Sequence, residues 1–98
     1  MKKQKVYYFG EPHLTHDEVD AVRRVLESKW IGFGKESIAL ENELIRYTKA
    51  KDGSIVNSCT AALHLALLLR NVKSGDEIIT TPLTFASTVG TMLWEGAI

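Results

Sequence analysis

Small polar residues gather at one point in the middle of the chain, immediately before its most apolar segment. The Asn-Ser-Cys-Thr sequence of residues 57–60 follows the β-branched pair Ile55-Val56 and precedes an alanine- and leucine-rich run that starts at Ala61. The first N–H groups of a helix have no intrahelical partner, and the positive end of the helix dipole lies there. A phosphate bound at this junction would accept hydrogen bonds from those amides and from the Ser58 or Thr60 hydroxyl.

The same hydroxyls have a simpler use, because Ser and Thr are common helix N-caps and a cap needs no ligand. Taken alone, the junction fits a cap or a phosphate site, and the cap is the commoner of the two.

A second polar cluster follows residues 77–81, which have the composition of a strand and end before Pro82. There, three hydroxyl residues (Thr84, Ser87 and Thr88) surround Phe85. Ligands of open α/β sheets bind at the carboxyl edge of the strands, so we expect both clusters at one edge. Phe85 is either a core residue or a ring that stacks on a flat ligand. Together the clusters indicate a ligand with a phosphate and an aromatic ring.

Two other chemistries find little support. Cys59 and His64 suggest a cysteine hydrolase, but on a helix five residues turn the side chains about 140° apart, which prevents a dyad. We expect His64 to pack inside with its ring nitrogens hydrogen-bonded. His13 and His16 have no neighbours that complete a metal set, so no metal site is predicted.

The elements that position these clusters alternate between helix and strand. After an extended arm up to Pro12, Thr15 and Glu18 form a capping-box pattern that predicts a helix over roughly 16–28. A second amphipathic helix is expected over roughly 36–49, and the last helix up to about Glu95. With strands at Ile55-Val56 and 77–81, this order favours an α/β layer with parallel strands. The central helix from Ala61 is apolar nearly all round and should be covered on most sides.

Between the first two helices, glycines alternate with large side chains in a loop that includes Trp30, Gly32, Phe33 and Gly34. Such a loop either tucks under its own domain or forms the wall of a ligand site. The two glycines are not a dinucleotide-binding fingerprint, because the third glycine and the preceding strand are missing.

Composition sets broad limits. The chain has 98 residues, enough for one small domain, and its 12 basic residues balance 12 acidic ones, which gives no electrostatic sign of nucleic-acid binding. No segment approaches the roughly 20 apolar residues of a membrane-spanning helix. A single cysteine is compatible with a reducing compartment, so the default expectation is a cytoplasmic protein.

Residues 58–67, Ser-Cys-Thr-Ala-Ala-Leu-His-Leu-Ala-Leu, resemble the S-G-T-A-A-L-H-L-A-L signature of the DegT/DnrJ/EryC1/StrS aminotransferases. Members of this family use pyridoxal 5′-phosphate (PLP) to aminate keto groups on nucleotide-linked sugars. Further blocks agree and keep the family's order, so that the resemblance extends over nearly the whole chain from about Glu11. They are residues 15–19, 30–34, 41–44, 75–79 and 84–88.

The resemblance implies a fold as well. It is the amino-terminal part of the large domain of a fold-type I PLP-dependent transferase, an α/β structure with a mixed, mostly parallel sheet flanked by helices. Residues 1–98 would be a single incomplete domain, with the arm and helices in 1–50 and the start of the PLP-binding large domain in 51–98. In that domain the two strand segments are expected apart, with later strands between them.

The resemblance also implies roles for individual residues. The backbone at Thr60 and Ala61, with the Thr60 hydroxyl, would hold the cofactor phosphate, and Phe85 would stack on the pyridine ring. Cys59 stands where the family has glycine, so the phosphate loop must accommodate a side chain there. Ser87 replaces the usual alanine. The loop residues Trp30, Gly32, Phe33 and Gly34 would lie near the sugar-nucleotide site.

The family's Schiff-base lysine, and the aspartate that pairs with the pyridine nitrogen, belong to blocks beyond Ile98, so no catalytic residue is assigned here. The expected whole enzyme is a homodimer that uses a nucleotide-linked keto-sugar and an amino-acid donor, glutamate. The segment alone is expected to bind PLP weakly and not to transaminate. Two alternatives stay open: a sugar dehydratase of the same family, which lacks that lysine, and a non-catalytic interaction module.

Overall fold

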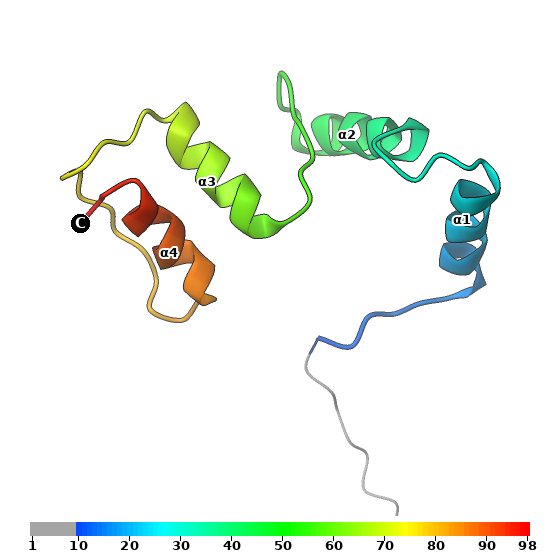
Figure 1. Cartoon of the computed structure of the whole chain (residues 1–98), viewed down its shortest axis with the longest axis horizontal. Coiled ribbons are helices and arrows are strands. Elements are labelled where there is room, and N and C mark those ends of the chain that lie inside the picture. Colours follow the sequence, from blue (N-terminus) through cyan, green and yellow to red (C-terminus); the bar gives the residue numbers. More distant parts are fainter. Residues whose placement is uncertain (1–9) are drawn as a thin grey trace, which may run out of the picture. The chain divides into compact units, whose positions relative to one another are not determined.

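The computed structural model describes residues 10–98, and four α-helices lie in that range (Figure 1). Each begins and ends close to the residues that the sequence predicts. The expected amino-terminal arm lies largely outside the described residues. The chain divides into two compact units, Met1–Ile38 and Ala39–Ile98. The helices are α1 (His16–Glu27), α2 (Lys35–Thr48), α3 (Cys59–Leu69) and α4 (Ala86–Trp94).

Helix α1 begins with the predicted capping box. The Thr15 hydroxyl oxygen accepts a hydrogen bond from the Asp17 N–H at 3.2 Å. In return, the Glu18 carboxylate accepts from the Thr15 backbone N–H and from the Thr15 hydroxyl, both at 2.6 Å. Both bonds hold the pKa of Glu18 below its ordinary value, and the bond from the hydroxyl has the larger effect. The carboxylate therefore stabilises the start of the helix while it is ionised.

In the loop between α1 and α2, the Trp30 side chain contacts the backbone of the same loop. The Trp30 indole N–H donates to the Phe33 carbonyl at 2.8 Å. A Cβ atom added at Gly34 would lie 2.8 Å from Trp30 Cδ1, which is closer than side-chain contacts allow. A side chain at residue 34 would therefore have to displace the indole ring.

The chain that leaves α2 folds back onto this helix. One carboxylate oxygen of Glu41 accepts from the Ser54 hydroxyl at 3.1 Å and from the Ile55 N–H at 3.0 Å. A Cβ atom at Gly53 would lie 3.1 Å from Ile45 Cγ1, so the backbone passes close to the helix surface. Glu41 therefore fixes the path of the chain just before the polar junction at residues 57–60.

Helices α3 and α4 pack against each other, and Figure 1 shows that both begin at the same end of the pair. At the opposite end, the segment after α3 pairs with the segment after α4 through their backbones. The Ile78 N–H donates to the Ile98 carbonyl at 2.9 Å, and the Ile98 N–H donates to the Asp76 carbonyl at 2.8 Å. This is the hydrogen-bond pattern of a parallel pair of strands.

The sheet expected from the sequence is not formed within residues 10–98. Ile55-Val56 and residues 77–81 carry no strand, and they are not paired with each other. A strand needs a neighbour to satisfy its backbone groups, and only the short pairing with Ile98 supplies one. Val56 is consequently exposed rather than buried, and Ile79 is 100 % exposed.

The expectation that the central helix is covered on most sides is wrong for this structure. In α3, Leu65, Leu68 and Leu69 are exposed, because α4 covers this helix on one side only. Among the described residues, Thr91 and Ala97 are the buried ones, and both belong to α4 or to the turn that follows it. The core is therefore confined to the α4 side of this unit.

We expect Gly34→Ala to expel the Trp30 indole and break its hydrogen bond to the Phe33 carbonyl. The Trp30 indole N–H resonance in a ¹H–¹⁵N NMR spectrum should shift and exchange faster with solvent, with Trp30→Phe assigning the peak. Gly32→Ala is the matched control, because a Cβ atom there would lie 3.9 Å from Trp30 Nε1, an ordinary contact distance. An unmoved indole resonance in Gly34→Ala would contradict the described loop.

The capping box makes the start of α1 pH-dependent. Since the folded-state pKa of Glu18 is lowered, its stabilisation is present above the ordinary carboxyl range and is lost as the pH falls through the lowered pKa. Backbone ¹³C shifts of residues 16–20 should report fraying in acid, and Glu18→Gln should remove most of this pH dependence. Thr15→Ala should destabilise the helix by about 1 kcal/mol at neutral pH. Glu27→Gln serves as control, and an equal effect there would count against the capping box.

Candidate functional site

The junction before α3 is organised by Ser58. Its backbone is extended, and its hydroxyl oxygen accepts a hydrogen bond from the Ala61 N–H at 3.1 Å. Ser58 is thus the N-cap of α3, the simpler of the two uses that the sequence leaves open. Within residues 10–98, the N–H groups of Cys59 and Thr60 donate to no protein acceptor, and the Thr60 hydroxyl has no partner either. The cap leaves these groups available.

These available groups form a donor set that suits a phosphate. Two amides and one hydroxyl lie within the first turn of α3, where the helix dipole favours negative charge. Thr60 is half-buried, whereas the Cys59 side chain is exposed. An exposed Cys59 side chain leaves the backbone amides accessible, so the cysteine that replaces the family's glycine does not by itself block the junction.

Phe85 occupies the corresponding position before α4. It is the N-cap residue, its backbone is extended, and its carbonyl accepts from the Thr88 N–H at 3.0 Å. The backbone is therefore held while the side chain stays 80 % exposed. The hydroxyls of Thr84 and Thr88 are hydrogen-bonded to each other at 2.8 Å across this turn. An exposed aromatic ring on a fixed backbone is suited to stacking on a planar ligand.

His64 meets the expectation of a packed, hydrogen-bonded histidine at one of its two nitrogens. Its Nε2 lies 2.5 Å from a carboxylate oxygen of Glu95, and the two side chains are 36 % and 18 % exposed. The Trp94 ring stands nearly perpendicular to the imidazole, at a centroid distance of 5.5 Å. The imidazole is thus engaged with the end of α4 rather than with Cys59, which agrees with the exclusion of a dyad.

The Trp30 loop borders a separate hollow of about 780 Å³ in the first unit. Trp30, Gly32 and Gly34 line it, whereas the exposed Phe33 does not. Arg24 and Lys35, which the sequence analysis did not single out, add positive charge to its wall. Both cations flank the aromatic loop in the sequence. Cations near a loop are so common, however, that this position alone does not identify them as site residues.

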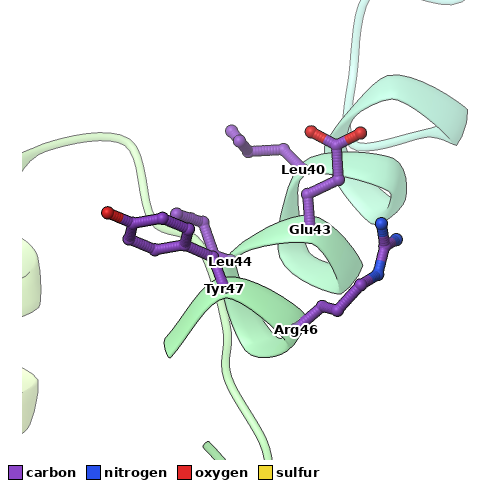
Figure 2. A pocket seen from close by; sticks show the side chains of 5 residues that line it. All are labelled: Leu40, Glu43, Leu44, Arg46 and Tyr47. Atoms are coloured by element: carbon purple, nitrogen blue, oxygen red, sulfur yellow. The ribbon is translucent and has the colours of Figure 1, made fainter. Parts of the chain in front are cut away.

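Helix α2 carries another hollow, which Figure 2 shows from close by. All its lining side chains come from one helix, with two leucines and a tyrosine beside a glutamate and an arginine: Leu40, Leu44, Tyr47, Glu43 and Arg46. This is the ordinary mixture of an amphipathic surface, and it brings together no constellation for chemistry.

Within residues 10–98, no three or more His, Cys, Asp or Glu side chains are arranged to hold a metal ion. No helix in this range could span a membrane.

Among proteins of known sequence, the chain is 40 % identical over 96 residues to the spore coat polysaccharide biosynthesis protein SpsC of Bacillus subtilis, covering 98 % of this chain and 25 % of that protein. It is 38 % identical over 86 residues to a UDP-4-amino-4-deoxy-L-arabinose–oxoglutarate aminotransferase of Shewanella sediminis, covering 88 % of this chain and 22 % of that protein. The chain thus spans about a quarter of the length of these relatives.

The chain is also similar to solved structures of aminotransferases. A putative sugar aminotransferase from Streptococcus pneumoniae in its PLP form has a TM-score of 0.83 and 34 % identity, covering 94 % of this chain and 24 % of that one. The PMP form of the same protein also has a TM-score of 0.83, over 94 % and 23 %. An aminotransferase from Psychrobacter cryohalolentis has a TM-score of 0.81 at 34 % identity, over 88 % and 22 %. This likeness supports fold-type I architecture.

The family model of the DegT/DnrJ/EryC1/StrS aminotransferases matches residues 12–98 and confirms the resemblance seen in the sequence. The chain belongs to this family, whose aminotransferases depend on pyridoxal 5′-phosphate.

Proposed function

We propose that this chain is the cofactor-phosphate part of an aminotransferase that moves an amino group from glutamate to the keto group of a nucleotide-linked sugar. The observation that carries the proposal is the first turn of α3. There Ser58 caps the helix, and the amides of Cys59 and Thr60 with the Thr60 hydroxyl remain available for an anion. This donor set fits the phosphate of the cofactor on which the family depends.

Each residue at the two helix starts has a defined task in this proposal. The Thr60 hydroxyl and the amides at the start of α3, including that of Ala61 shared with Ser58, donate to the phosphate. Phe85 covers one face of the cofactor ring and keeps water from it, since its exposed side chain is free to stack. When bound, PLP supplies the electron-withdrawing ring that makes transamination chemistry accessible.

The substrate side of the proposal rests on the hollow beside Trp30. Its wall combines an indole ring with the cations Arg24 and Lys35, a pairing suited to a nucleobase and phosphates. The relative from Shewanella sediminis carries a UDP-sugar and oxoglutarate in its name, which supports a nucleotide-linked sugar and a glutamate donor here. Trp30, Gly32, Phe33 and Gly34 would contact this substrate. The complete enzyme would be a cytoplasmic homodimer.

The 98-residue chain alone should bind PLP weakly and should not transaminate, because no residue in it is assigned to the covalent step. Purified chain mixed with PLP, glutamate and a nucleotide keto-sugar should yield no amino-sugar by mass spectrometry. A full-length relative, such as the enzyme from Shewanella sediminis, is the positive control. Any stoichiometric turnover by the chain would contradict this expectation.

Single substitutions should show that the phosphate-binding residue Thr60 and the ring-stacking residue Phe85 each contribute to cofactor binding. Binding is best measured with pyridoxamine 5′-phosphate (PMP), which lacks the aldehyde that reacts with surface lysines. Thr60→Val should weaken PMP binding by about tenfold, since one hydrogen bond to a charged group is lost, while Thr60→Ser should keep most of it. Phe85→Ala should weaken binding about threefold to tenfold through lost stacking.

The matched aromatic control is Tyr47→Ala, which removes an exposed ring of α2 that has no role in the proposed site. It should leave PMP affinity unchanged. If Thr60→Val and Phe85→Ala bind PMP as well as the unsubstituted chain, the assigned roles are wrong.

A further inference from the structure

The hydrogen bond between His64 and Glu95 is a side-chain link between α3 and the end of α4. His64 Nε2 and Glu95 Oε1 are 2.5 Å apart. An ionised carboxylate can only accept, so the imidazole N–H is the donor. Trp94 packs edge-on against the same imidazole. Among the described residues, no other side-chain hydrogen bond joins these two helices and their caps.

His64 lies one helical turn after Thr60. Residues four apart on an α-helix lie on the same face, so the turn that carries His64 also fixes the direction in which Thr60 points. The half-buried residues of α3 follow this face: Thr60, Leu63, His64 and Leu67 at helical spacing, with Ala61 beside them. Anchoring His64 thus sets the rotation of α3 about its own axis.

Glu95 is the C-cap residue of α4, the helix that starts after Phe85. The ends of the two helices are also held through the backbone, where the Gly75 N–H donates to the Gly96 carbonyl at 2.8 Å. That contact ties together the segments that follow the two helices. The His64–Glu95 bond adds a side-chain restraint on the rotation and slide of α3 along α4, beside the packing of the two helices.

We propose that His64 and Glu95 are positioning residues that set the separation of Thr60 and Phe85, and so the match between the phosphate and ring halves of the cofactor site. This inference rests on the proposed cofactor roles of those two residues. Neither His64 nor Glu95 touches the cofactor in this account. Their contribution is to let one rigid ligand reach both helix starts at once.

The separation can be measured without any ligand. Cys59 is the single cysteine of the chain and is exposed, and Leu83, two residues before Phe85, is 92 % exposed. In a Leu83→Cys background, spin labels at both positions report the distance between the two helix starts by pulsed electron paramagnetic resonance. The distribution should be narrow with Glu95 present and should broaden in Glu95→Ala. Glu43→Ala, which removes an exposed glutamate of α2, should leave the distribution unchanged.

Two conservative variants separate positioning from folding. Glu95→Gln still offers an oxygen to the His64 N–H and should keep the narrow distribution. If Glu95→Ala loses its helical circular dichroism signal, Glu95→Asp takes its place. Aspartate keeps a carboxylate with a shorter reach, so it should broaden the distance distribution in a folded chain. An unchanged distribution in a folded Glu95→Ala or Glu95→Asp chain would overturn the inference.

Ligand binding supplies the second readout, on unlabelled chains with Leu83 intact. Glu95→Ala should weaken PMP binding about tenfold, the effect of losing one hydrogen bond to a carboxylate, while NMR shifts of the Thr60 amide with inorganic phosphate stay as in the unsubstituted chain. Equal weakening of PMP and phosphate would overturn positioning in favour of a structural role. Failure of the unsubstituted chain to bind PMP would instead overturn the proposed function, and the distance measurement would still decide whether the pair fixes the helices.

Discussion

The packing of α3 against α4 is the contact on which the rest of this unit depends. The buried residues of the described chain, Thr91 and Ala97, lie on the α4 side of that contact, and the backbone pairing of Ile78 with Ile98 closes it at one end. The other end holds the two helix starts, where Ser58 and Phe85 are the cap residues. Everything proposed about the cofactor uses groups that this one helix pair brings to the same end.

The packing of α3 on α4 leaves apolar side chains exposed on the surface of the helix pair. Alpha-helices that are apolar on every side are stable when other elements cover them, and α3 keeps Leu65, Leu68 and Leu69 in contact with water. In segment 77–81, Ile79 is fully exposed, and the backbone is paired where Ile78 bonds to Ile98. Apolar area of this kind is what a larger fold-type I domain would cover, in agreement with a chain that spans about a quarter of its relatives' length.

The parts of the fold that could be predicted are those whose causes are local. The capping box of Thr15 and Glu18 needs four consecutive residues, and the periodicity of α1 and α2 needs only a few turns. The strands could not be verified in the same way, because a strand is defined by a partner that can lie anywhere in the chain. Ile55-Val56 has the right composition but no strand partner within residues 10–98, so it forms no strand there.

The same distinction between local and long-range causes applies to the candidate site. The junction at Ser58 and Thr60 could be located from the sequence, since a helix start follows from local pattern. The place of Phe85 before the last helix could be located too, but its exposure could not, because the sequence fits a core ring equally well. The contact between His64 and Glu95 could not, because these residues are 31 positions apart and only the packing of α3 on α4 brings them together. The charged wall of the Trp30 hollow was missed because Arg24 and Lys35 belong to ordinary helical patterns.

The most direct test of the central claim is a residue-resolved NMR titration of the chain with pyridoxamine 5′-phosphate, inorganic phosphate and pyridoxamine. Inorganic phosphate is expected to shift the amides of Cys59, Thr60 and Ala61, and pyridoxamine is expected to shift the ring of Phe85. The phosphorylated compound should shift both sets together. Shifts centred on other residues, or a phosphorylated compound that leaves the start of α3 unperturbed, would contradict a cofactor site at these two helix starts.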